Sequence, residues 1–347
     1  MEQITPSGAN DSTTVGKRLL KTYPKLVPTL KRVFADKKSR TQDSAKALIK
    51  AFPQDDVKVI EISEDEEYHS VIPHKYCPNF SKEAGDGELE KFIEHYTKPI
   101  VSRLQPFSPV KLTSRDIVAM QQFCGYESAI TGKNSPLCDI FTSTEWMGYE
   151  YAWDVKYQYM VGHGNPLSPY LGFPWLNVTS NLFSNIEEAS AAEAVDDQRF
   201  FVSFTHREVP PFIATALGLF NSTSSALEDM PTDRINFGRS WRMAELIPFL
   251  GHIGIEKLSC DASSGALREV HDQKADKTWT KEFVRIVANA APRPIPRCQD
   301  GPGASCPFQQ FKTFVTMGME QYGDFHSVCG DHEKVGVGAS RPLVWQN

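Results

Sequence analysis

The sequence predicts an α/β domain, a mixed sheet flanked by helices, with an α-helical subdomain inserted into it. Short apolar strands alternate with amphipathic helices in residues 1–79, and strand patterns return in residues 196–347. Residues 80–195 contain long helical patterns and few strand signals. Alternation of strands and helices is typical of a sheet covered by helices. We therefore expect an α/β domain in two parts around a helical subdomain.

The first part is predicted from the spacing of its apolar residues. Val15, Leu19 and Leu20 share one helical face, and Ala45, Leu48 and Phe52 form a second stripe. Apolar and polar residues alternate over 57–62, as in a half-buried strand. The expected elements are a helix from Asn10 or Ser12 to Tyr23, a strand at 33–35, a helix at 42–52 and a strand at 57–62.

The subdomain and the second part are predicted in the same way. Three long helical patterns fill most of the inserted region, and apolar runs with strand character follow it. The expected helices are 89–104, 114–131, 143–160 and 308–319, and the expected strands are 200–204, 253–259 and 283–287.

Composition excludes several classes of partner. The chain has 347 residues and a net charge of −6, without a basic stripe, so we expect no nucleic-acid partner. Its longest strongly apolar stretch, Val209–Phe220, contains two prolines and is too short to span a bilayer, so we expect no membrane partner. A site for phosphate would have to be a local basic pocket.

The seven cysteines favour disulfides in an oxidising compartment, because they are spread out and form no zinc-type cluster. Four N-x-Ser/Thr sequons agree with a secreted glycoprotein. The odd cysteine count leaves one without a partner, and the N-terminus lacks the apolar core of a signal peptide. Both observations lead us to expect a truncated N-terminus. The candidate glycosylation sites are Asn10, Asn79, Asn177 and Asn221.

The most informative segment is 200–220. An apolar strand ends at Thr205-His206, and Pro210 and Pro211 then begin a helix. His206 and Glu208 therefore lie at the carboxyl end of a strand beside a helix N-terminus, a place that favours anions. The spacing alone also allows a structural role, in which His206 caps the helix and Glu208 complements its dipole.

The same segment resembles the second signature of the histidine acid phosphatases, of the fungal acid phosphatase and phytase type, in its Thr-His turn and Ala-Leu-Gly-Leu-Phe helix. Three other segments resemble family elements in the same order. They are FADKKSRTQDSAKALIKAF at 34–52, LCDIFTSTEWMGYEYAWDVKYQYMVGHGNP at 137–166 and YGDFHSVC at 322–329. The resemblance implies a phosphoglycerate-mutase-like fold and hydrolysis of phosphomonoesters, either phytate or general phosphate esters.

The family's chemistry is phosphoryl transfer through a phosphohistidine, which implies no metal and no other cofactor. By position, Arg40 would bind phosphate, His206 would hydrogen-bond it and Glu208 would be the proton donor. Most relatives have aspartate where this chain has Arg207, but some branches use His-x-Glu, which the chain matches. Arg207 would face solvent or add positive charge near the substrate. Lys37 and Lys38 either attract a phosphate-rich substrate or form a solvated strand end.

The family's Arg-His-Gly motif, which carries the nucleophilic histidine, does not occur in the chain. Thr5-Pro6-Ser7-Gly8 resembles the segment that follows that motif, so we expect the nucleophile and the first, central strand to lie upstream of Met1. On that expectation this chain alone is inactive and poorly folded. A gene model begun too late is the simplest explanation. The rival is a catalytically inactive secreted glycoprotein, a pseudophosphatase with a binding or structural role.

The resemblance also implies disulfides and a location. Cys260 is left over, and its family partner lies before the Arg-His-Gly motif. The full-length protein would be secreted, or located in the cell wall or vacuole, and no oligomeric state follows. The implied pairs are Cys77–Cys329, Cys124–Cys138 and Cys298–Cys306.

Overall fold

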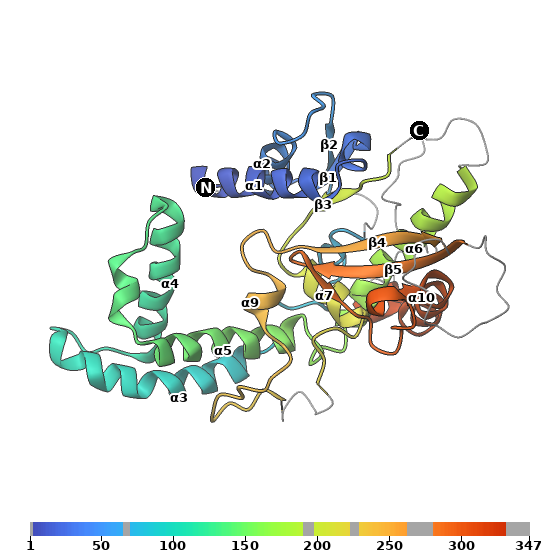
Figure 1. The fold of residues 1–347 in the computed structure, drawn as a ribbon. Helices are drawn as coiled ribbons and strands as arrows, with labels where there is room; N and C mark the ends of the chain where they lie inside the picture. The colour runs from blue at the N-terminus through green and yellow to red at the C-terminus, as the bar shows by residue number, and fades with distance from the viewer. Residues whose placement is uncertain (1–2, 65–69, 190–197, 223–228, 262–279, 331–347) are drawn as a thin grey trace.

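In the computed structural model the strands form two sheets (Figure 1). The structure describes residues 3–64, 70–189, 198–222, 229–261 and 280–330. A parallel sheet has the order β2-β1-β3, and an antiparallel sheet has the order β4-β5-β6 with β7 also paired to β5. The bounds are β1 Arg32–Asp36, β2 Lys58–Ile62, β3 Val202–Phe204, β4 Ile253–Asp261, β5 Thr280–Ala288, β6 Ala291–Arg293 and β7 Cys306–Pro307.

The α/β class is confirmed, but the strands do not form one mixed sheet. Val33 in β1 is in register with Val59 on one side and Val202 on the other. β3 pairs only with β1, and β4 pairs only with β5, among the residues that the structure describes. No described strand joins β3 to β4, so parallel and antiparallel strands remain in separate sheets. The three-part division of the chain stays a prediction.

Helix α1, Pro6–Thr22, begins earlier than expected, because Thr5 caps it and accepts a hydrogen bond from the Gly8 amide at 3.0 Å. It lies against α2, Ser39–Ile49. The Ser12 hydroxyl donates to the Ser44 carbonyl at 2.7 Å, and a Cβ on Gly16 would lie 2.5 Å from the Leu48 carbonyl oxygen. This close approach covers an apolar cluster between α1, α2 and β1.

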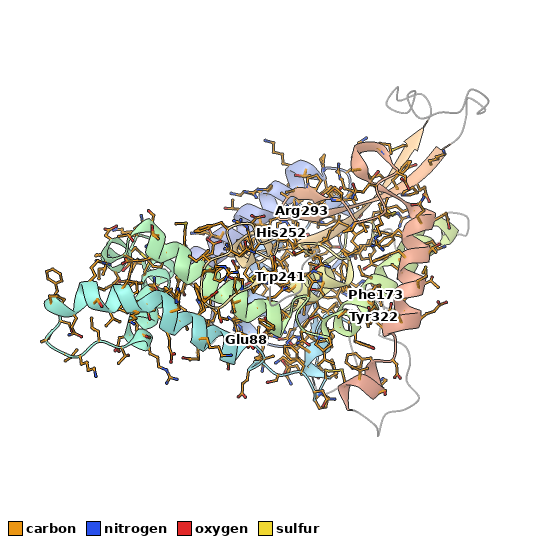
Figure 2. All side chains as sticks on the ribbon, turned by 90° about the horizontal axis from the view of Figure 1, so that it is seen from below. Glu88, Phe173, Trp241, His252, Arg293 and Tyr322 are labelled. Atoms are coloured by element: carbon orange, nitrogen blue, oxygen red, sulfur yellow. A yellow bond between two sulfur atoms is a disulfide. The ribbon has the colours of Figure 1, made fainter. Side chains whose placement is uncertain are left out.

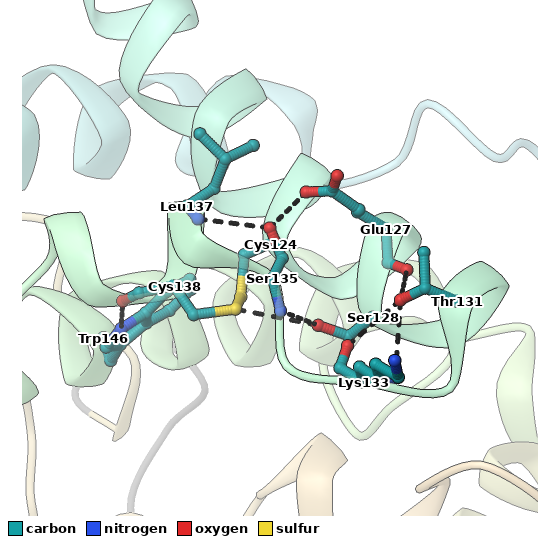
Figure 3. The surroundings of a disulfide bond; sticks show 9 residues. All are labelled: Cys124, Glu127, Ser128, Thr131, Lys133, Ser135, Leu137, Cys138 and Trp146. Carbon is teal, nitrogen blue, oxygen red and sulfur yellow. Dashed lines mark hydrogen bonds between the residues drawn. A yellow bond between two sulfur atoms is a disulfide. The ribbon is translucent and has the colours of Figure 1, made fainter.

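Three long helices form an arm that extends from the rest of the molecule (Figure 1). They are α3 Asp86–Leu104, α4 Ser114–Thr131 and α5 Ser143–Met160. Thr113 and Thr142 begin α4 and α5 with capping boxes. The Cys124–Cys138 disulfide ties α4 to the segment before α5, where the Trp146 indole also donates to the Cys138 carbonyl at 3.2 Å (Figure 3).

The sequence did not single out α6, Ser168–Ala189, which packs beside α7, Val209–Ala216, and α10, Phe308–Tyr322. Phe173 of α6 stacks on Tyr322 of α10 with 5.3 Å between ring centroids (Figure 2). The main apolar core runs through α3, α5, α6, α7, β5 and α10. Two further short α-helices lie in the described residues, α9 Met243–Leu246 and α11 Phe325–Cys329.

The structure contains the three disulfides in the pairing that the resemblance implies, and Cys260 is unpaired. Cys77–Cys329 joins residues 252 positions apart. None of the described helices combines the length and the apolar character needed to cross a membrane.

Candidate active site

The strands of the parallel sheet bring three functional side chains to its carboxyl edge. Asp36 is the last residue of β1, Glu64 follows β2 by two residues and His206 follows β3 by two residues. Because parallel strands end at the same edge, these side chains meet there. His206 Nε2 lies 2.9 Å from Asp36 Oδ2. The edge therefore presents a carboxylate–imidazole pair.

Asp36 is fully buried and ionised. Burial acts to raise the pKa of Asp36, but the contact with His206 and the hydrogen bond from the Lys38 amide more than offset it, so the pKa lies below its ordinary value. The other carboxylate oxygen, Oδ1, is buried without a hydrogen-bond partner among the described residues. The imidazole of His206 therefore lies directly beside a buried carboxylate.

Glu208 lies immediately before α7 and is 2% exposed. Its Oε1 is 2.9 Å from Lys82 Nζ. Burial acts to raise the pKa of Glu208, but the charge of His74 and the hydrogen bond from Lys82 outweigh it and hold the pKa below its ordinary value. Helix α7 has no side-chain cap hydrogen bond, so His206 does not cap it, while Glu208 stands at its N-cap position.

The two arginines of the sequence prediction differ in exposure. Arg40 is the second residue of α2 and half-buried. Arg207 is exposed, with its guanidinium 5.7 Å from the Tyr157 ring centroid and its Nε 4.0 Å from Glu208 Oε1. Arg40, His206, Arg207 and Glu208 all line one cavity of about 1820 Å³.

The family model for the histidine phosphatase superfamily (branch 2) matches residues 1–289. The chain belongs to this family. It is 29% identical over 350 residues to the acid phosphatase PHO1 of Komagataella pastoris, covering 97% of this chain and 68% of that protein. It is 29% identical over 309 residues to the phytase PHO112 of Candida albicans, covering 86% of this chain and 59% of that protein. The chain thus spans about three fifths to two thirds of the length of these curated relatives.

Solved structures show the same fold. The phytase from D. castellii superposes with a TM-score of 0.77 at 22% identity, covering 99% of this chain and 74% of that one. The multiple inositol polyphosphate phosphatase of Bifidobacterium longum superposes with a TM-score of 0.60 at 12% identity, covering 98% and 82%. These matches confirm a histidine phosphatase fold, in which strands combine with a helical region.

In this chain the basic residues near the sheet edge gather around one carboxylate. Glu64 has three lysine ammonium groups close to its oxygens: Lys75 at 3.0 Å, Lys38 at 3.7 Å and Lys37 at 3.8 Å. Asp36, Glu64 and His206 also have ligand-type atoms within 4.8 Å of one another. The three ammonium groups add positive charge close to this cluster. Lys37 and Lys38 thus both lie near Glu64 at the sheet edge.

Sequence reasoning missed Asp36 and Glu64, and also two residues of a neighbouring segment, His74 and Lys82. Both come from the segment between β2 and α3, which shows no apolar periodicity. Lys156, a buried residue of α5, fixes that segment by donating to the Lys82 carbonyl at 2.6 Å and the Ala84 carbonyl at 2.9 Å. Lys82 lines the cavity, whereas His74 and His163 do not; His163 Nε2 lies 2.8 Å from the Leu219 carbonyl oxygen.

Proposed function

We propose that this protein is a phosphomonoester hydrolase of the acid phosphatase or phytase type that acts through a phosphohistidine. The observation that supports this most is the cavity shared by Arg40, His206 and Glu208. An arginine, an imidazole paired with a carboxylate and a buried acid are the groups that phosphoryl transfer needs for charge stabilisation and proton donation. Relatives named as acid phosphatases and phytases agree with this assignment.

Phosphate binding rests on the positive groups at the sheet edge. Arg40 is suited to hold two phosphate oxygens with its planar guanidinium. His206, held by Asp36 at 2.9 Å, donates to a third oxygen. The N-terminus of α2, which begins at Ser39, adds a favourable dipole. A phosphate monoester, with phytate as a polyphosphorylated example, fits these contacts better than a neutral ester does.

Glu208 would protonate the leaving alcohol. In the structure Lys82 lies 2.9 Å from it and its pKa is low, so the carboxylate is ionised. A bound phosphate dianion raises the pKa of Glu208 by like-charge repulsion, and it also competes for the exposed Lys82 side chain. Substrate binding therefore turns Glu208 into an acid at the moment when a proton is needed.

We assign the attacking histidine to no residue of this chain. None of the nine histidines follows an arginine. This observation favours a second candidate, a protein that binds phosphate esters without turning them over. Both candidates share the phosphate site, and they differ in hydrolysis.

The disulfides support a location in an oxidising compartment, outside the cell or in a cell wall or vacuole. Asn10, Asn79 and Asn221 are exposed, whereas Asn177 lies half-buried on α6. Glycosylation at the exposed positions stays a prediction, checked by mass spectrometry of the protein expressed through a eukaryotic secretory pathway.

The experiment measures binding of inorganic phosphate to the 347-residue chain by titration calorimetry, and release of 4-nitrophenol from 4-nitrophenyl phosphate. We expect Arg40→Ala to weaken phosphate binding at least tenfold, which is about 1.4 kcal/mol. Arg115→Ala is the matched control, because Arg115 is an exposed residue of α4 whose side chain is 84% accessible. Equal binding in both variants, or no binding by the wild type, contradicts the site.

Hydrolysis separates the two candidates. Binding without nitrophenol release from this chain favours the binding protein, unless a supplied Arg-His-Gly segment restores turnover. We expect turnover to appear when the chain is preceded by that segment from a phytase relative, and to vanish again when its histidine is replaced by alanine.

A further inference from the structure

His74 is a buried histidine beside the site that the proposed mechanism does not use. It lies in the short 3-10 helix Pro73–Lys75 and is 6% exposed. Neither ring nitrogen has a hydrogen-bond partner among the described residues. Buried polar groups are nearly always paired, so an unpaired imidazole next to a reactive centre points to a role that requires a vacant nitrogen.

The packing around His74 holds its ring between aromatic side chains. Its centroid lies 5.5 Å from that of His206 in an edge contact, 5.8 Å from that of Phe80 and 6.4 Å from that of Phe212. Phe80 and Phe212 also contact each other at 5.6 Å. The two phenylalanines therefore pack the His74 ring beside that of His206.

The charges that face His74 come from four elements. They are Glu208 before α7, His206 after β3, Lys75 in its own helix and Lys82 before α3. Burial lowers the pKa of His74 to about 4, against the opposing charge of Glu208. The influence is mutual, because His74 is the strongest of the groups that lower the pKa of Glu208. The two residues therefore titrate as a coupled pair in the same acidic range.

We propose that His74 is a positioning residue that shares the catalytic proton with Glu208. This rests on the proposed function, in which Glu208 donates a proton to the leaving alcohol. After that transfer the Glu208 carboxylate takes the proton from the His74 imidazolium N–H, which leaves a neutral imidazole and a neutral carboxylic acid. One proton moves, one N–H bond breaks and one O–H bond forms, and no electrons are transferred.

The contact between Lys82 and Glu208 determines when Glu208 can hydrogen-bond with His74. In the structure its ammonium group lies 2.9 Å from Glu208 Oε1, and its own side chain is 59% exposed. A phosphate group in the cavity attracts this flexible ammonium group and frees the carboxylate to hydrogen-bond with His74. Proton exchange thus follows substrate binding, and the buried position of His74 keeps the proton from bulk water.

The experiment is an NMR titration of the 347-residue chain labelled with ¹³C at the glutamate carboxyl carbons. Glu208→Gln assigns the Glu208 signal. We expect this signal to titrate in two steps in the wild type. In His74→Gln we expect one step, displaced to higher pH by about one unit because a positive neighbour has been removed. His95→Gln is the control, since His95 is an exposed residue of α3, and it should leave the titration unchanged.

A second variant separates proton sharing from packing. His74→Phe keeps the ring contacts with Phe80 and Phe212 but cannot titrate, so it should give the same displacement as His74→Gln. A Glu208 titration that is unchanged in both variants, or changed in only one, overturns the proposal. Reciprocally, Glu208→Gln should lower the pH at the midpoint of the His74 ring titration. This measurement leaves His74 unchanged, and an unchanged midpoint also overturns the proposal.

Phosphate binding by the same samples tests the proposed function separately. If the wild type binds no inorganic phosphate, the proposed function fails, while the titration still decides whether His74 and Glu208 share a proton. If phosphate binds and the Glu208 signal titrates in the same way in the wild type and in the His74 variants, the proposed function stands and only the shared proton is excluded.

Discussion

His206 Nε2 lies 2.9 Å from Asp36 Oδ2, which joins the residue after β3 to the last residue of β1. The contact links β1 and β3, which are neighbours in the parallel sheet with Val33 in register with Val202, although Asp36 and His206 lie 170 positions apart in the chain. Asp36 is fully buried, so its charge acts on His206 with little screening by water. The contact therefore places the imidazole of His206 against the carboxyl edge of β1.

Replacement of Asp36 by asparagine should remove the buried carboxylate that contacts His206 Nε2. Loss of one partner of a buried polar contact typically costs about 1–3 kcal/mol of stability. We expect Asp36→Asn to lower the midpoint of urea unfolding and to weaken phosphate binding more than Asp43→Asn, an exposed-face control on α2 whose partner is Lys46 at 3.8 Å. A variant as stable as the wild type would show that the pair contributes nothing.

The same pair predicts a dependence of stability on pH. The folded pKa of Asp36 lies below its ordinary value, so its contribution is complete above the unfolded pKa of about 3.9 and is lost as the pH falls through the folded pKa. Asp36→Asn should therefore lose less stability than the wild type on acidification below about pH 4. Unfolding midpoints measured at several pH values check this difference.

Gly172 allows α6 and α7 to pack closely against each other. A Cβ at this position would lie 2.2 Å from the Phe212 carbonyl oxygen, which is backbone and cannot move aside. We expect Gly172→Ala to destabilise the protein by about 1–3 kcal/mol. Gly125→Ala on α4, where a Cβ meets nothing within 4 Å, should instead stabilise it by roughly 1 kcal/mol through helix propensity. Thermal unfolding of the two variants should move in opposite directions.

The Cys77–Cys329 disulfide constrains the unfolded chain over a separation of 252 residues. Replacing both cysteines with serine should cost about 2–5 kcal/mol, because the unfolded state regains the entropy of a long loop. The unpaired Cys260, replaced with serine, serves as the control and should change the unfolding midpoint little. Similar losses in both would indicate that cysteine packing, rather than the cross-link, stabilises the fold.

The elements that the sequence predicted well are those with local signals. The starts of α4 and α5 agree with the prediction because Thr113 and Thr142 each begin a capping box within four residues. Helix α6 was missed, since it contains Pro174 and its apolar residues pack against α7 and α10, which are distant in sequence. The separation into two sheets was also missed, because strand order depends on pairings that no local pattern records.

Some residues of the candidate site could likewise be predicted from local signals, and others could not. Arg40, His206 and Glu208 lie at junctions of a strand and a helix, and such junctions can be recognised from apolar runs, prolines and family motifs. Asp36 was within reach of the same reasoning, as the polar residue that ends an apolar strand. Lys82 was not, because its place beside Glu208 depends on the buried Lys156 of α5, more than seventy residues away.

In a form of the protein that turns over phosphate esters, we expect Glu208 to protonate the leaving alcohol. An alkyl alcohol leaves as a strongly basic alkoxide and needs a proton, whereas nitrophenolate leaves without one. Glu208→Gln should therefore reduce kcat for an alkyl phosphate by about 10²–10⁴-fold and change kcat for 4-nitrophenyl phosphate far less. Parallel losses on the two substrates would remove Glu208 as the proton donor. Glu83→Gln, at the neighbouring loop position next to Lys82, is the matched control and should leave both rates unchanged, because the Glu83 side chain does not line the cavity.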